Sequence, residues 1–158
     1  MLYFVLFLMF IIPAAVTAVV VLGILYLLTI ERKRRNDRII RKSEHSKFMY
    51  YPIRYASKER FNKLLKLYPW EESGVLFIKN DNTVVFSYYK HNTIKQIVLP
   101  VSKDNLEWEG NVGKNGLAHW FSIKHEGFRH YFSADTGTFI FSSREKTKEI
   151  FETIQSTL

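Results

Sequence analysis

Cysteine is absent from this sequence of 158 residues. Its absence excludes a cysteine nucleophile, cysteine ligands for a metal ion, and the lipid-modified cysteine of a lipoprotein signal. It does not identify the compartment, because a chain without cysteine is compatible with oxidising and with reducing surroundings.

The short motifs of common enzyme classes are also missing. There is no GxSxG, no HExxH and no glycine-rich phosphate loop that enters a helix. The glycines of 110–116 lie between predicted strands, so Lys114 does not complete a phosphate loop. Asp135, Thr136 and Gly137 match the aspartic-protease triplet, but that chemistry needs two carboxylates, and the same letters are typical of a turn. We therefore expect a non-enzymatic protein that needs no cofactor.

Charge is absent from one long stretch, residues 2–30. As a helix, this stretch would be about 43 Å long, which exceeds the roughly 30 Å hydrocarbon core of a bilayer. Pro13 and Gly23 are tolerated in membrane helices, and Ala14 and Ala18 have the small-xxx-small spacing of packed membrane helices. The sequence predicts one transmembrane helix over 2–30 with these four residues in the anchor.

A cleaved signal peptide is the alternative, with residues 16–18 (Val-Thr-Ala) as the cleavage site. Signal peptides begin with basic residues and have an apolar core of about 7–15 residues. Here no Lys or Arg precedes the apolar run, and the run continues well past Ala18. An uncleaved anchor is the favoured interpretation.

Basic residues dominate the juxtamembrane stalk, 31–48, which has eight Lys or Arg against three Asp or Glu. This surplus of five makes up most of the net charge of +8 and predicts a cytoplasmic stalk, with the N-terminus outside the cell membrane. We expect Arg32 to be an interfacial anchor only, and we expect no nucleic-acid partner. Ile39 and Ile40 are the only apolar spot within 32–47, so this segment is not expected to pack. The side chains predicted to contact anionic lipid headgroups are Lys33, Arg34, Arg35, Arg38, Arg41 and Lys42.

The soluble domain is predicted over 49–158. A leading helix over 57–68 has Ser57 as its cap and an apolar stripe that includes Phe61. The period then changes to that of strands over 75–142, and an amphipathic closing helix follows over 144–156. Its stripe comprises Thr147, Ile150, Phe151, Ile154 and Leu158. The seven strands are predicted at 75–79, 83–89, 94–99, 106–109, 117–125, 128–134 and 138–142.

Three histidines are predicted on one face of the sheet. A two-residue turn at Glu126 and Gly127 would place His119, His125 and His130 on the same side. The spacing along the strands is too long for a compact metal site, and no HExxH accompanies them. We interpret them as core or rim residues and expect no metal.

Seven short antiparallel strands followed by one helix resemble the pleckstrin-homology (PH) superfold, including GRAM and small bacterial PH-like domains. The resemblance implies a bent sheet nearly closed into a barrel, with the last helix filling one end. The lipid-binding members carry a basic cluster in the loop after their first strand, where this chain has Asn80-Asp81-Asn82 between Lys79 and Thr83. Protein binding is the use that the resemblance then implies. The segments that carry it are 74–78, 83–86, 97–100, the hairpin 120–132 and the helix 144–155.

These patterns predict a membrane-anchored α+β protein that presents a PH-like domain at the cytoplasmic face. Its expected partners are membrane lipids and a protein, as an adaptor or a subunit of a membrane complex. Two alternatives stay open: an immunity or regulatory protein that acts on a toxin or secretion component, and a sensor of anionic lipids. Abundant Phe, Tyr, Lys, Ile and Asn are typical of an AT-rich bacterial genome.

Overall fold

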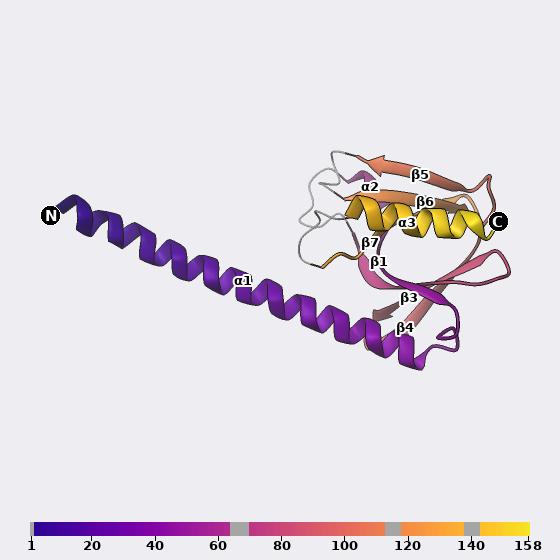
Figure 1. The fold of residues 1–158 in the computed structure, drawn as a ribbon, viewed down its shortest axis with the longest axis horizontal. Helices are drawn as coiled ribbons and strands as arrows, with labels where there is room; N and C mark the ends of the chain where they lie inside the picture. The colour runs from indigo at the N-terminus through magenta and orange to yellow at the C-terminus, as the bar shows by residue number, and fades with distance from the viewer. Residues whose placement is uncertain (1, 64–69, 113–117, 138–142) are drawn as a thin grey trace.

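The computed structural model describes residues 2–63, 70–112, 118–137 and 143–158 (Figure 1). These residues form three helices and a seven-stranded antiparallel sheet, so the predicted α+β class is confirmed. The elements are α1 (Leu2–Lys42), β1 (Met49–Ser57), α2 (Lys58–Asn62), β2 (Glu72–Ile78), β3 (Thr83–Lys90), β4 (Thr93–Pro100), β5 (Leu106–Asn111), β6 (His119–His125), β7 (Phe128–Ala134) and α3 (Ser143–Ser156).

Helix α1 is one unbroken helix of 41 residues. Its N-terminal part extends far from the sheet, and its C-terminal part lies alongside it (Figure 1). It is long and apolar enough to cross a membrane. Its basic segment continues the same helix to Lys42 instead of starting a separate element. The predicted anchor residues Pro13, Ala14, Ala18 and Gly23 are all exposed on the protruding part.

The strands are arranged in the order β4-β3-β2-β1-β7-β6-β5. The first strand, β1, therefore lies at the centre and pairs with both β2 and β7. The sequence did not predict β1. A strand was predicted instead at 138–142, which lies outside the described residues. The structure and the prediction thus both contain seven strands, but the observed set begins with β1, which was not predicted.

Helix α2 is shorter than the predicted leading helix, and it comes second in the order of sheet-domain elements, after β1. It follows β1 instead of preceding every strand, and it ends at Asn62. The predicted cap is confirmed, because the Ser57 hydroxyl accepts a hydrogen bond from the Arg60 amide at 3.3 Å. The backbone of Lys63 is extended and ends the helix. The remainder of the predicted helix, 64–68, lies outside the described residues.

Two tight hairpins fix the register of the strands. Glu126 and Gly127 have φ of 50° and 79°, which gives the predicted two-residue turn and pairs His125 with Phe128. The β3–β4 turn likewise consists of His91 and Asn92, with φ of 48° and 60°. Such left-handed residues match the twist of the flanking strands, so both turns are closely defined in shape.

One core lies on the inner face of the sheet and beneath α3. It contains residues of every strand, including Leu99 of β4 and Leu106 of β5, so the sheet curls around it as in a small barrel or sandwich. Ile150 and Ile154 of α3 are fully enclosed, which confirms the closing helix. Phe151 is only partly buried, between the rings of Trp108 and Phe121.

Candidate membrane-proximal site

The basic end of α1 packs against the outer face of the sheet, contrary to the expectation of an unpacked stalk. Ile39 is 0% exposed and forms an apolar cluster with Val75 and Phe77 of β2 and Val85 of β3. Ile40 packs partly against the same cluster. The outer faces of these central strands are apolar, so they need a cover. The prediction failed because this cover is supplied by a segment some forty residues away.

A buried carboxylate joins α1 to the sheet. Asp135 Oδ1 accepts hydrogen bonds from Arg54 at 2.9 Å and from Arg32 at 3.1 Å. Arg54 is fully buried in β1, and its burial lowers the pKa of its guanidinium. The Arg54 guanidinium also lies 4.2 Å from the centre of the Trp70 ring. Asp135 supplies the counter-charge that a buried arginine needs.

The segment Asp135 to Gly137 is a turn with an additional role. Gly137 has φ of 86°, and its amide donates to Asp135 Oδ1 at 3.1 Å, as in a side-chain-stabilised turn. Because the carboxylate also binds two arginines, the interpretation of Asp135 as a turn residue alone was incomplete. Arg32 likewise has a partner in the domain, so it is more than the interfacial anchor that was expected.

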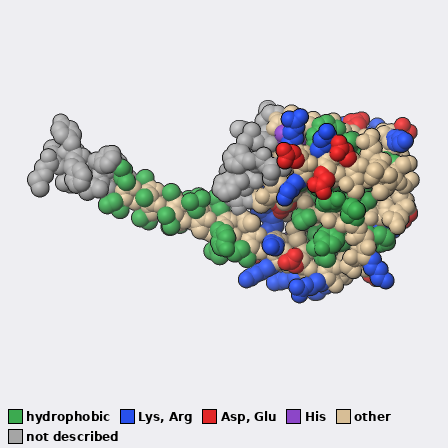
Figure 2. Space-filling view, viewed as in Figure 1, with side chains coloured by type: hydrophobic (Ala, Val, Ile, Leu, Met, Phe, Trp, Pro, Cys, Tyr) green, Lys and Arg blue, Asp and Glu red, His purple; other side chains and the backbone are tan. Residues whose placement is uncertain are grey.

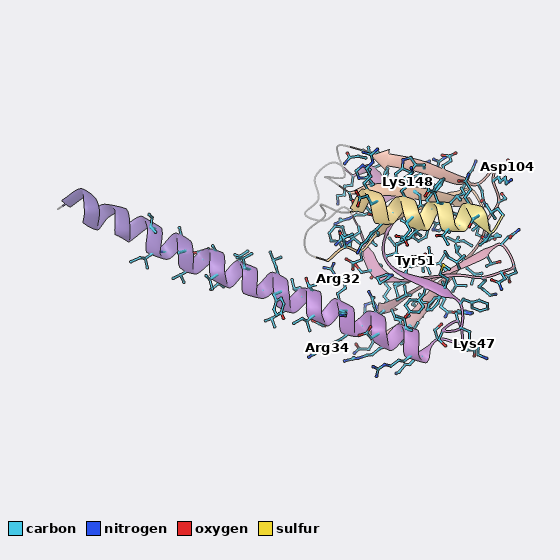
Figure 3. The ribbon with its side chains drawn as sticks, in the orientation of Figure 1. Arg32, Arg34, Lys47, Tyr51, Asp104 and Lys148 are labelled. Carbon is cyan, nitrogen blue, oxygen red and sulfur yellow. The ribbon has the colours of Figure 1, made fainter. Side chains whose placement is uncertain are left out.

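The six predicted lipid-contacting cations are exposed on α1. The docked residues Arg32, Asn36 and Ile39 are spaced four and three apart and share one face of the helix. Arg34 and Arg38 lie on a different face (Figure 3 labels Arg32 and Arg34). Lys and Arg side chains gather where α1 meets the domain, whereas the protruding arm is apolar (Figure 2). The full set is Lys33, Arg34, Arg35, Arg38, Arg41 and Lys42.

A basic cavity of about 340 Å³ lies on one flank of the docked helix. Three of the six predicted cations, Arg34, Arg35 and Arg38, line it together with Glu31. The opposite wall comes from the β3–β4 hairpin and comprises Tyr89, His91 and Asn92. These hairpin residues were not predicted as part of a site, and the His-Asn pair indicated only a turn at this position.

The other predicted cations lie elsewhere. Lys33 lines a cavity of about 470 Å³ on the opposite flank, together with Asp37, Tyr50 and Lys146. Lys42 borders a third hollow with Glu44 and Lys95. The six cations predicted to contact headgroups therefore lie in different places on the surface. Three of them, Arg34, Arg35 and Arg38, line the same cavity.

The histidines lie as the register predicted, with Ile123 opposite His130. The ring of His130 is half-buried, which lowers its pKa, and Nδ1 lies 3.1 Å from the Tyr55 hydroxyl. Burial of Tyr55 raises the pKa of its phenol to about 12. Among the described residues, no three His, Asp or Glu side chains are grouped so that they would hold a metal ion.

Comparisons of the chain with protein-family models, with curated proteins and with solved structures gave no match.

Proposed function

We propose that the protein is a membrane-tethered, non-enzymatic binding protein that presents a PH-like domain at the cytoplasmic face of the cell membrane. One observation carries this proposal: α1, which is long enough to cross a bilayer, packs through Ile39 and Arg32 on the domain that follows. The anchor and the domain would then form one rigid unit, with the domain held directly at the membrane surface.

The PH-like assignment is supported by the order of the strands. Each strand pairs with its neighbour in the chain from β1 to β4 and from β5 to β7, and β1 then pairs with β7. A curled sheet results that is open between β4 and β5, and α3 packs on its core. Lys79 of the β2–β3 loop is bonded to Asp81 at 3.1 Å, which leaves this loop poorly suited to bind a headgroup. Protein binding is accordingly the use that we propose for the domain.

The terminal strand β4 offers a surface for a protein partner. Of the described strands, β4 and β5 are the two at the ends of the sheet. The two-residue hairpin makes Lys90 and Thr93 a hydrogen-bonded pair, so alternate residues of β4, from Ile94 to Val98, direct backbone groups away from β3. Val98 is 54% exposed. An extended segment of a partner would add to this edge by backbone hydrogen bonds.

Site-specific photo-crosslinking in native membranes tests the partner-binding edge. We expect a crosslinker at Val98 to give a defined adduct with one protein. The matched control is a crosslinker at Lys148, which is exposed on α3 (Figure 3). Identical adducts from both positions, or none from Val98, would contradict binding at β4.

The orientation is supported by the stalk, where eight of the basic residues follow the apolar run and none precedes it. A reporter that is active only outside the cytoplasm, fused after Leu158, is expected to be silent. A reporter that is active only in the cytoplasm, fused at the same place, is expected to work. The reverse result would overturn the proposed topology.

Contact with anionic lipids is a second candidate function, supported by the exposed cations of α1. Near a surface rich in anionic lipid, each basic residue contributes about 1 kcal/mol. A helix rises about 1.5 Å per residue, so in a helix along the membrane normal Lys33, Arg34 and Arg35 lie within about 8 Å of Ile30. Arg41 and Lys42 lie about 17 Å away, beyond the roughly 8 Å screening length. We thus propose that the first three residues contribute most.

A further inference from the structure

We propose that the basic cavity between α1 and the β3–β4 turn is a binding site for a phosphate group. The inference deepens the lipid-contact function proposed above and depends on it for one of two possible sources. The phosphate belongs either to an anionic phospholipid or to a small soluble phosphate compound. Both sources present the same chemistry to the cavity.

The lining of the cavity has the composition that a phosphate requires. Arg34, Arg35 and Arg38 line it, against a single carboxylate, Glu31. Guanidinium groups donate two parallel hydrogen bonds to phosphate oxygens, which makes arginine the preferred residue for this ligand. Glu31 lies 3.8 Å from Arg35, so its charge is partly balanced within the helix.

The hairpin wall adds further polar groups. Tyr89, His91 and Asn92 all line the cavity, and each has a polar side chain. A phenol, an imidazole and a carboxamide each donate hydrogen bonds, and a protonated imidazole adds positive charge. Burial raises the pKa of the neighbouring Glu72, and the charges of Lys90, Arg35 and His91 oppose that shift. Phosphate would thus contact two elements that lie far apart in the sequence.

The two walls are held in place before any ligand arrives. On one side, α1 is fixed to the sheet by the fully buried Ile39. On the other side, Tyr89 packs partly against the same apolar cluster, and the turn residues His91 and Asn92 have defined left-handed backbones. Preformed walls reduce the entropy lost on binding. The preformed walls distinguish the cavity residues from exposed basic residues such as Arg41 and Lys42, which do not line it.

The height of the site above the membrane leaves both sources of phosphate open. Arg34 follows Ile30 by about 6 Å along α1, and Arg38 by about 12 Å. The polar layer on each side of a bilayer is about 5–8 Å thick. The lower part of the cavity would therefore reach lipid phosphates, and its upper part would face the solution.

The test titrates the full chain in detergent micelles with dihexanoyl phosphatidic acid and, separately, with inorganic phosphate. Binding is followed by NMR through the imidazole signals of His91 and the Nε–H signals of the arginines. We compare R34Q/R38Q with R41Q/K42Q, which loses the same charge from the same helix but outside the cavity. We expect R34Q/R38Q to weaken binding at least about tenfold, the equivalent of one charge-assisted hydrogen bond, and R41Q/K42Q less than about twofold.

The remaining results decide between the sources or overturn the site. Tighter binding of phosphatidic acid than of inorganic phosphate identifies a lipid, and equal binding identifies a soluble phosphate. Both results support a phosphate site. Equal losses of affinity in the two double variants would show that binding depends only on the overall positive charge of the helix, and would overturn the site. The measurement does not depend on topology, so it fails independently of the reporter experiment.

Discussion

The carboxylate of Asp135 accepts a hydrogen bond from Arg32 at 3.1 Å, although the two residues are separated by 103 positions in the chain. Arg32 belongs to α1 and Asp135 follows the end of β7. The same carboxylate is the partner of Arg54, which has no exposed surface. The attachment of α1 to the sheet and the neutralisation of a buried charge thus depend on the same residue.

Replacing Asp135 by Ala is expected to lower the free energy of unfolding by about 3–5 kcal/mol, because Arg54 would be left buried without a counter-charge. Asp135→Asn should cost less, since the amide oxygen still accepts the hydrogen bond of the Gly137 amide. Chemical denaturation of the full chain in micelles measures both. Asp81→Asn, in an exposed ion pair with Lys79, is the control and should change stability little. Equal effects at both sites would contradict the role of Asp135.

Replacing Ile39 by Asp is expected to release α1 from the sheet, because a carboxylate would enter the cluster of Val75, Phe77 and Val85. The absence of native cysteine allows spin labels at K42C and K148C without further changes. Pulsed electron spin resonance should show one narrow distance distribution in the parent and a broad one in the Ile39 variant. Arg41→Ala, on an exposed position of the same helix, should keep the narrow distribution.

Within α3, Ile154→Ala is expected to destabilise the domain by about 2–5 kcal/mol, as for a fully buried aliphatic residue. Phe151→Ala should cost less than Ile154→Ala, because Phe151 is only partly buried at the edge of the core. The order of the two midpoints in a denaturant titration checks this expectation. A larger effect at Phe151 would show that the aromatic contacts with Trp108 and Phe121 dominate the packing of α3.

Acidification is expected to destabilise the domain through His130. Burial lowers its pKa in the folded state, so between that value and the usual value of about 6.5 the unfolded chain binds the proton more readily. Protonation of His130 therefore costs little stability above about pH 6.5, and the free energy of unfolding decreases as the pH falls below that value. Thermal melts between pH 7.5 and pH 5.5 should show this slope, and His130→Gln should reduce it.

Local patterns predicted the parts of the fold that depend on neighbours in the sequence. The Glu126-Gly127 turn set the register of β6 and β7, and the stripe of α3 identified Ile150 and Ile154 as core residues. Strand β1 was missed because four consecutive residues, Ile53 to Ala56, are buried, which removes the alternation of a half-exposed strand. The buried Arg54 also makes β1 difficult to predict, because a charged residue is not expected inside a buried strand.

The candidate site was predictable only on its helical side. Arg34, Arg35 and Arg38 were identified from the excess of charge beside an apolar run. His91 and Asn92 lie more than fifty residues away in the chain, and no local signal relates them to α1. The pairing of Arg32 with Asp135 is of the same kind, since it arises only when the sheet brings the end of β7 beside α1.

The position of β1 has a mechanical consequence. The chain passes from α1 through a short connection into the central strand, which is paired on both sides. A pulling force applied through α1 would therefore load the middle of the sheet and not an edge. To yield, β1 would have to give up its hydrogen bonds to β2 and to β7 together. A domain connected in this way resists a force applied through α1 better than one connected through a terminal strand.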